Sequence, residues 1–424
     1  MPSTMLTLLT TSWNGPAGIS LSAFLSGITP FYNPLQPHPN EQIHKHLLET
    51  KESLIDQDLT WIENVEQLIA TGRPLSVLYD TLARPGADIG ETNPSCLRWE
   101  KRRERAVDHL VLGETPIGGS WNDYDPEMVA VSFSSWLDLP GYSVNEYLEG
   151  TPLVSRLPSV VIAAYMEGYT KRLGIRKNFK PHTKVNSLKK EGDIWIASGQ
   201  YSDGHRFTVT SNSVVLACGK TKPRVLGLPN EESCQKVVYD VLSLKARILQ
   251  DLENGEEYTS GQGPKVVIVG DGISSADAVR HCMHHGIPVL HVMRKNDRQL
   301  RSILMSRLSP THYGEYTSIY RLMTGKEQHA LYEKCSGSVV SAVDDESVTI
   351  SCPKEERREP LGLLTVCIGR ETEVGDIFDG KLDIEEYESL SDPSLSAVGA
   401  VAGDHFVRYL VGGCLHVARQ ILKK

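Results

Sequence analysis

Short apolar runs, each followed by a glycine-rich turn and a helical pattern, recur along the chain. The clearest run, at residues 265–269, passes directly into a turn over 270–275 and then into a helical stretch. A continuous apolar run of this length is typical of a strand buried on both faces of a parallel sheet. Near the N-terminus, residues 5–9 precede a glycine turn at 14–18 and a helix at 19–25. The pattern predicts two strand–turn–helix units.

Other apolar runs add strands and helices around these units. Single strands are predicted at residues 109–112, 213–219 and 363–369, antiparallel strands at 184–187, 193–198 and 206–210, and helices at 158–173 and 408–422. Residues 29–96 are too long for a loop, so their helical patches predict an insertion with its own packing. The repeated order of strand and helix predicts the α/β class, with two dinucleotide-binding Rossmann-type domains.

The composition is that of an ordinary globular protein, with 40% hydrophobic and 23% charged residues. A net charge of −9 argues against nucleic-acid binding. The basic run at residues 98–105 contains two glutamates and is interpreted as a solvated helix face. Because no apolar run reaches the ~20 residues of a transmembrane helix and the N-terminal segment lacks signal-peptide features, no transmembrane segment and a cytoplasmic location are expected.

Eight cysteines are spread along the chain without a CxxC pair. Such a spread is typical of reduced thiols in the cytosol. The missing pair also argues against a flavin disulfide reductase, which needs two neighbouring thiols. No cluster of histidine and cysteine has metal-ligand spacing, so no metal site is expected.

The turn after residues 265–269 carries the strongest chemical signal. Gly270 permits a tight turn, Gly272 allows a pyrophosphate to approach the backbone, and Ser275 is small enough for helix and strand to pack closely. Phosphates bind well at a helix N-terminus, because its N–H groups and dipole favour anions. This turn is therefore predicted to bind a dinucleotide.

The strand after this turn ends on two cations, Arg294 and Lys295. An NAD site usually has an acidic residue near this point to bond the ribose hydroxyls. Cations suit the additional phosphate of NADPH instead. The alternative interpretation is a surface pair at a strand end.

The N-terminal turn is less regular. Gly15 and Gly18, with Asn14 before them, hold the positions for pyrophosphate approach and helix packing, but Trp13 stands where the first glycine is expected. Taken alone, these residues also suit an ordinary Gly-Pro turn.

Two later segments add candidate flavin contacts. Gly119 allows close backbone approach and Trp121 can stack over a ring, although a core tryptophan beside a glycine turn has the same sequence. Gly403 and Asp404 precede a helix, and the carboxylate can accept hydrogen bonds from ribityl hydroxyls. The alternative for Asp404 is a simple helix N-cap.

The order NGPAG, GGSW, VVLACG, GDGISS, TVCIG and GD resembles the class B flavin monooxygenases. Within that class the chain is similar to the oxidative stress-induced growth inhibitor family. That similarity is carried by NGPAGISLSAFLSG, LIDQDL, LRWEKRRERAVDHLVLG and AVGAVAGDHFVRYLVGG. The resemblance implies FAD and NADPH as cofactors. It also implies roles in oxidative stress, growth restraint, differentiation, cell death and cytokinesis at the midbody.

The resemblance assigns the domains and the site residues. It implies an FAD-binding domain at residues 1–225 and 371–424, and an inserted NADPH-binding domain at 226–370. The predicted FAD contacts are Asn14, Gly15, Gly18, Gly119, Trp121, Gly403 and Asp404, and the predicted NADPH contacts are Gly270, Gly272, Ser275 and Arg294. Two departures are Trp13 and the lack of a clear acidic residue at the end of the first unit's second strand.

Three functions agree with this sequence. The first is an NADPH-dependent flavin monooxygenase with an unidentified small-molecule substrate. The second, with the same cofactors, is an amine N-hydroxylase or an NADPH oxidase. The third is a scaffold that keeps the fold and regulates growth and cytokinesis through protein partners. No catalytic side chain is predicted.

Overall fold

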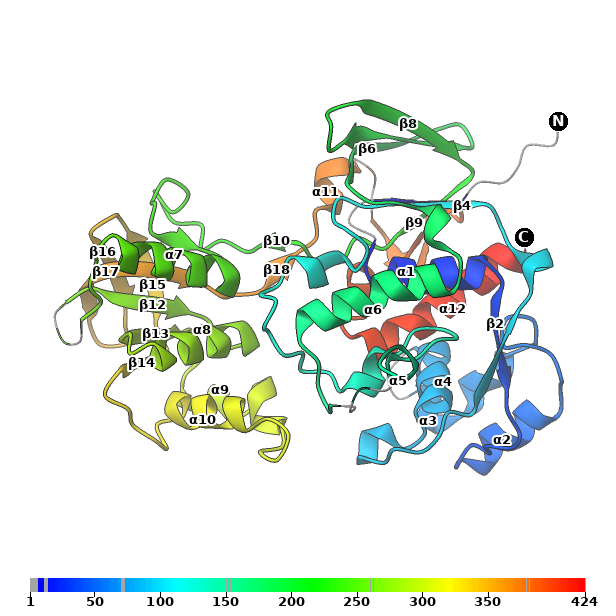
Figure 1. The fold of residues 1–424 in the computed structure, drawn as a ribbon, viewed down its shortest axis with the longest axis horizontal. Helices are drawn as coiled ribbons and strands as arrows, with labels where there is room; N and C mark the ends of the chain where they lie inside the picture. Colours follow the sequence, from blue (N-terminus) through cyan, green and yellow to red (C-terminus); the bar gives the residue numbers. More distant parts are fainter. Residues whose placement is uncertain are drawn as a thin grey trace. The chain divides into compact units, whose positions relative to one another are not determined.

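The computed structural model describes residues 7–10, 14–69, 73–149, 151, 154–259, 261, 263–378, 380 and 382–423. Contacts divide the chain into unit 1, Met1–Thr221 with Thr372–Lys424, and unit 2, Lys222–Glu371. The short antiparallel pair of β10 (Lys222–Pro223) and β18 (Arg370–Glu371) marks where the chain enters and leaves unit 2 (Figure 1).

Unit 1 is built on a sheet that has seven strands within its described residues. At its centre β1 (Thr7–Thr10) pairs in parallel with β4 (His109–Leu112) and β9 (Ser213–Leu216). The remaining strands, from one edge to the other, are β19 (Ile384–Glu385), β20 (Glu388–Ser389) and β21 (Leu395–Ala397) beside β9, and β5 (Phe179–Lys180) beside β4. The strands from β21 through β9, β1 and β4 to β5 are parallel neighbours, whereas β19 and β20 pair antiparallel at one edge.

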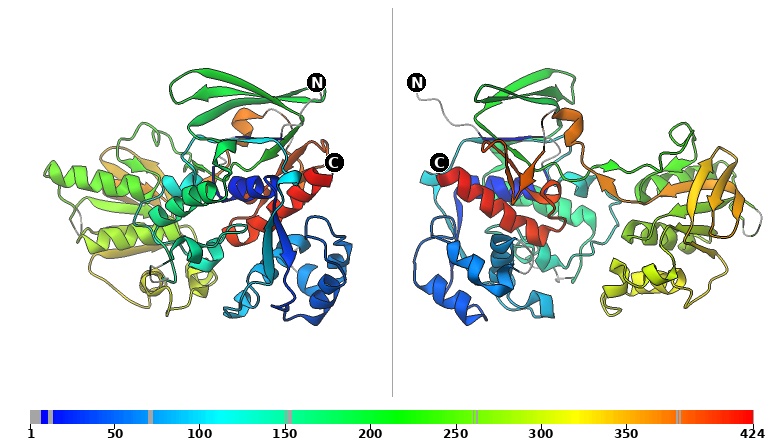
Figure 2. Two further views of the ribbon diagram at one scale, coloured as in Figure 1. Left: turned by 45° about the vertical axis from the view of Figure 1, so that its right-hand side comes forward. Right: turned by 180° about the vertical axis from the view of Figure 1, so that it is seen from behind.

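Helices cover this sheet, and its first and last helices pack together. Helix α1 (Pro16–Leu25) packs against α12 (Val407–Lys423), and both views of Figure 2 show them side by side. Helix α6 (Ser159–Arg172) matches the predicted amphipathic helix. A separate antiparallel sheet of β6 (Thr183–Glu191), β7 (Ile194–Tyr201) and β8 (Arg206–Ser211) confirms the three predicted strands.

The insertion is joined to unit 1 by a two-stranded ribbon of β2 (Ile28–Tyr32) and β3 (Leu97–Lys101). Its helices are α2 (Glu41–Leu48), the short α3 (Glu66–Ile69) and α4 (Pro74–Ala83), with 3₁₀ turns at η1 (Thr60–Asn64) and η2 (Ala87–Ile89). Its buried apolar side chains join the core of unit 1. The prediction that the insertion packs on its own is therefore wrong.

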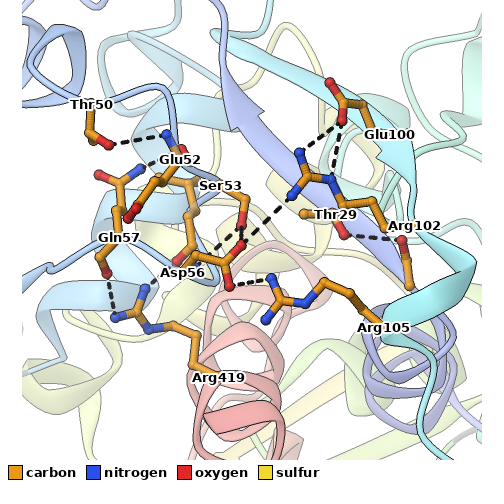
Figure 3. A network of polar contacts seen from close by, with 12 residues as sticks. Thr29, Thr50, Glu52, Ser53, Asp56, Gln57, Glu100, Arg102, Arg105 and Arg419 are labelled. Atoms are coloured by element: carbon orange, nitrogen blue, oxygen red, sulfur yellow. Dashed lines mark hydrogen bonds and ion pairs between the residues drawn. The ribbon is translucent and has the colours of Figure 1, made fainter.

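Polar contacts also tie the insertion to the rest of unit 1 (Figure 3). Asp56 pairs with Arg105 and, at 4.0 Å, with Arg102, while Arg419 of α12 donates to the carbonyl of Gln57 at 3.0 Å. The basic run is thus not a helix face, as predicted: it forms β3 and the 3₁₀ turn η3 (Arg103–Arg105). Pairing with β2 overrides the helical propensity of its Arg and Lys residues.

Unit 2 contains a second sheet, again with seven strands in its described part. Strands β12 (Lys265–Val269), β13 (Val289–Met293) and β14 (Tyr332–Ser336) are parallel neighbours, and β17 (Glu356–Val366) pairs with the other side of β12. The remaining strands are β11 (Val237–Val238), β15 (Val339–Val343) and β16 (Ser347–Ser351), and the helices are α7 (Val241–Glu253), α8 (Ile273–His284), α9 (Asp297–Leu300) and α10 (Gly314–Met323).

Among the residues that the structure describes, no helix combines the length and the apolar character needed to span a bilayer.

Candidate dinucleotide sites

The glycine turn of unit 2 depends on the absence of a side chain at its first position. Gly270 has φ +139°, and a Cβ there would lie 2.3 Å from the carbonyl oxygen of Cys367. The turn therefore crosses the end of β17 at a distance that only glycine allows. This agrees with the predicted role of Gly270.

Gly272 has a different environment. It is the N-cap of α8 with φ −97°, and a Cβ there would meet no atom within 4 Å. The fully buried Ser275 donates its hydroxyl to the carbonyl oxygen of Gly272 at 2.7 Å and so fixes the first turn of the helix. Open space thus lies at the N-terminus of α8, where backbone N–H groups favour a phosphate.

A buried histidine, which the sequence analysis did not identify, supports this turn. His291 Nε2 lies 2.8 Å from the carbonyl oxygen of Gly270, and Nδ1 lies 2.9 Å from the hydroxyl of Tyr332. Burial lowers the pKa of His291 to about 4, so the ring is neutral near pH 7. Since a carbonyl only accepts, Nε2 carries the hydrogen and Nδ1 accepts from Tyr332. The signal in the sequence was one polar residue inside an apolar strand.

The two cations after β13 have different surroundings. Lys295 Nζ lies 2.8 Å from Oδ1 of Asp271, inside the glycine turn. Arg294 is exposed and has no hydrogen bond or ion pair within the described residues. Lys295 therefore holds the turn, whereas Arg294 remains available for an anion.

In unit 1 the structure brings two predicted motifs into direct contact. Gly119 has φ +60°, and a Cβ there would lie 2.7 Å from Cα of Gly15. The backbone N–H of Gly118 donates to the carbonyl of Asn14 at 2.6 Å. Oδ1 of the fully buried Asn14 has no hydrogen-bond partner among the described residues. The two motifs therefore touch backbone to backbone at the start of α1, beside an unused buried acceptor.

The other predicted residues of this region are placed as follows. Gly18 is buried within α1. Trp121 lies half-buried in η4 (Gly119–Asn122), edge-on to Tyr124 at a centroid distance of 5.6 Å. Trp13, the departure noted in the sequence, lies outside the described residues.

The C-terminal motif reaches the same helix. Gly399, in η8 (Gly399–Ala402), lies so close to α1 that a Cβ would be 2.8 Å from Cβ of Ala17. Gly403 follows with φ +97°, and then comes the buried Asp404. Because α12 begins only at Val407, Asp404 is not its N-cap. The predicted flavin motifs NGPAG, GGSW and GD therefore lie around the N-terminus of α1.

Asp404 already has one partner, which sequence reasoning missed. Arg73, at the start of α4 in the insertion, places Nη1 2.6 Å from Oδ1 of Asp404 and its guanidinium 4.9 Å from the ring centroid of Tyr387. Oδ2 of Asp404 has no hydrogen-bond partner among the described residues. Burial raises the pKa of Asp404, and Arg73 opposes that rise. No local pattern could have signalled a pair separated by 331 residues.

An acidic residue does follow the strand beside β1. The sequence analysis found none there, because the insertion separates β1 from its neighbour β4. Glu114 stands two residues after β4, with Oε1 3.1 Å from Nζ of Lys184. A cavity of about 340 Å³ opens beside it, and its lining residues are Glu114, Thr183, Lys184, Val185, Asn186, Cys218, Thr221, Glu373, Asp376 and Ile377.

Comparison with known proteins identifies the family. The chain is 50% identical to the oxidative stress-induced growth inhibitor homolog of Caenorhabditis elegans, over 96% of this chain and 92% of that protein. The chain belongs to the oxidative stress-induced growth inhibitor family. Human oxidative stress-induced growth inhibitors 2 and 1 share 28% and 29% identity, over 96% and 97% of this chain and 91% and 94% of theirs. No family model matches the sequence.

Solved structures show which fold this growth inhibitor family member has. Bacillithiol disulfide reductase from Bacillus cereus aligns with a TM-score of 0.61 at 13% identity, covering 98% of both chains. Ornithine hydroxylase from Pseudomonas aeruginosa aligns with a TM-score of 0.58 at 11% identity, covering 99% of this chain and 98% of that one. The predicted α/β fold with two Rossmann-type domains is confirmed.

Proposed function

We propose that this growth inhibitor family member is an NADPH-dependent flavoprotein oxidoreductase, with FAD in unit 1 and NADPH in unit 2. The observation that carries the proposal is the turn of unit 2, where Gly270 must be glycine and Gly272 faces open space. The fold requires glycine only at Gly270, because a Cβ on Gly272 would meet no protein atom. Gly272 is explained by a ligand that approaches the backbone at the N-terminus of α8.

Arg294 would select the coenzyme. It is exposed, and Lys295 beside it is already paired with Asp271. A guanidinium at the end of β13 can hold the 2′-phosphate of NADPH in a two-pronged hydrogen bond. His291 and Lys295 would fix the conformation of the turn through their contacts with Gly270 and Asp271.

The residues of unit 1 fit FAD. The backbones of Gly15 and Gly119 meet directly at the start of α1, where a side chain on Gly119 would not fit, and Asn14 offers an unused buried acceptor beside them. Asp404 would accept hydrogen bonds from the ribityl chain through Oδ2. Glu114 would bond the adenosine ribose, with the adjoining cavity taking the adenine. When bound, the flavin supplies the transfer of electrons from NADPH to an acceptor.

The family and the fold support the wider proposal. Relatives are named as growth inhibitors induced by oxidative stress, and a solved structure of similar fold is an ornithine hydroxylase. Monooxygenation of a small molecule is therefore the proposed reaction, with amine N-hydroxylation as its nearest variant. Action in the cytoplasm and at the midbody, with effects on differentiation, cell death and cytokinesis, belongs to the same proposal.

The test is Gly272→Ala. Its Cβ meets no protein atom, so the variant should fold normally, but the methyl group would occupy the space of a pyrophosphate. We expect NADPH to bind on the order of 100-fold more weakly, as an overpacked contact costs about 1–3 kcal/mol. Isothermal titration with NADPH measures this, and retained flavin absorbance shows that unit 1 is intact.

Gly314→Ala is the matched control, because Gly314 begins α10 and also faces open space. It should bind NADPH like the unsubstituted protein. Equal NADPH affinity in the Gly272→Ala variant would refute the site. A colourless protein that neither FAD nor NADPH can titrate would leave the scaffold function in its place.

A further inference from the structure

Two cysteines of unit 2 meet in the folded chain although 17 residues separate them. Cys335 lies on β14 and Cys352 directly follows β16, and their Sγ atoms are 3.6 Å apart. Both cysteines are free thiols, and their sulfur atoms are close to van der Waals contact. A disulfide requires about 2.05 Å between the sulfur atoms, so closing it needs a shift of roughly 1.5 Å.

The two thiols differ in access. Cys335 is 6% exposed and belongs to the apolar core of unit 2, whereas Cys352 is half-buried at the edge of that core. All eight cysteines lie in described residues, and every cysteine except Cys352 is buried. Burial also raises the pKa of the Cys335 thiol. A small oxidant therefore reaches Cys352 first, and Cys335 stands behind it as the second thiol.

We propose that Cys335 and Cys352 form a reversible dithiol–disulfide couple that hydrogen peroxide oxidises. The thiolate of Cys352 attacks one peroxide oxygen, the O–O bond breaks, and hydroxide leaves to take up a proton as water. The sulfenic acid so formed is attacked by the thiolate of Cys335, and the S–O bond breaks to release a second water. In sum, two thiols lose two electrons and two protons, and one peroxide becomes two waters.

The couple lies next to the loop that carries Arg294. Pro353, which follows Cys352, would be 3.5 Å from a Cβ on Gly337, and the N–H of Gly337 donates to the carbonyl of Lys295 at 3.0 Å. Val292 and Cys335 are opposite one another in the pairing of β13 with β14. Drawing Cys352 toward β14 therefore shifts Pro353 against this loop. This coupling rests on the NADPH binding proposed above, and it predicts weaker NADPH binding in the oxidised form.

The experiment uses the full chain, reduced and then treated with equimolar hydrogen peroxide. Alkylation and peptide mass spectrometry without reductant should show the loss of two alkylatable thiols and a linked peptide pair containing Cys335 and Cys352. Dithiothreitol should restore both thiols. A missing link, or a link from either residue to another cysteine, would overturn the couple.

Single variants separate the two roles. Cys335→Ser should accumulate a sulfenic acid on Cys352 that dimedone traps, whereas Cys352→Ser should leave Cys335 unoxidised. Cys234→Ser, which removes a buried thiol of the same unit, should form the disulfide normally. A dimedone adduct on Cys335 in the Cys352→Ser variant would reverse the proposed order.

NADPH titration of the reduced and oxidised protein tests the coupling separately. The oxidised protein should bind NADPH more weakly than the reduced protein. This loss of affinity should not exceed the loss that Arg294→Ala causes. Equal affinities overturn the coupling and leave the couple itself established by the peptide map. If the reduced protein binds no NADPH, the proposed function and the coupling both fail, and the peptide map still decides on the disulfide.

Discussion

At the scale of single residues, the two cations after β13 have separate roles. Arg294→Ala should weaken NADPH binding by about 10- to 100-fold, since a charged hydrogen bond to phosphate contributes about 1.5–3 kcal/mol, and should leave NADH binding nearly unchanged. Lys295→Ala is the control, because Lys295 pairs with Asp271 in the turn. It should weaken both coenzymes alike. Titration of each variant with NADPH and NADH measures the ratio, and an unchanged ratio in Arg294→Ala would contradict the assignment.

The pair of Arg73 and Asp404 permits a similar comparison for FAD. Either Arg73→Ala or Asp404→Ala breaks the 2.6 Å ion pair, but only the second removes the carboxylate proposed to bind the ribityl chain. We expect FAD content per chain, measured from flavin absorbance, to fall in Asp404→Ala and to persist in Arg73→Ala. Equal loss in both variants would mean that the ion pair acts through the fold alone.

At the scale of elements, Gly412 of α12 lets the insertion pack closely against this helix. A Cβ on Gly412 would lie 2.4 Å from Cα of Ser76 in α4, whereas one on Gly413 would meet the ring of Tyr387, outside the insertion, at 2.5 Å. Beside this contact, Arg408 of α12 and Asp80 of α4 form a buried ion pair at 2.6 Å. The two helices thus approach each other backbone to backbone.

Gly412→Ala should lower the free energy of unfolding by about 1–3 kcal/mol, because α4 and α12 must separate to admit the methyl group. The thermal midpoint of unfolding measures the loss. Gly375→Ala, in the short helix α11 (Val374–Ile377), is the control, since its Cβ meets no atom within 4 Å. A midpoint in Gly412→Ala equal to that of the control would show that this contact is not tight.

At the scale of the whole molecule, buried histidines link the stability of both units to pH. Burial lowers the pKa of His291 in unit 2 and of His416 in unit 1 to about 4, and it also lowers the pKa of His38, His109 and His405 in unit 1. Below pH 6.5 the unfolded chain takes up protons that the folded chain does not, so stability is lost as pH falls toward 4. In unit 1, burial raises the pKa of Asp138 to about 6, which opposes this loss because the folded carboxyl is protonated first.

His291 should contribute a loss of about 3 kcal/mol to the stability of unit 2 between pH 6.5 and 4. All six tryptophans lie in residues 1–221, so their fluorescence reports unit 1, while far-UV circular dichroism reports both units. Between pH 6.5 and 4, the urea transition seen by dichroism should move less in His291→Gln than in the unsubstituted protein, while the transition seen by fluorescence should move equally in both. An equal shift of the dichroism transition in both proteins would refute the role of His291.

The sequence alone determined the features that depend on neighbouring residues. Apolar runs, glycine positions and helical periodicity predicted the central strands, α1, α6 and α8, and the tight turn at Gly270, because backbone conformation and strand burial follow from local chemistry. The same local reasoning failed for residues 98–105, where pairing with β2 made a strand of a charged run.

Only the tertiary structure decided which distant residues meet. It placed Glu114 beside β1 across the insertion, paired Arg73 with Asp404, and brought Cys335 to within 3.6 Å of Cys352. It also gave the adjacent residues Arg294 and Lys295 different surroundings, since only Lys295 pairs with Asp271. Such contacts depend on strand order and on how helices pack. Arg73 and Asp404 are separated by 331 residues, and no local pattern in the sequence records a pair so far apart.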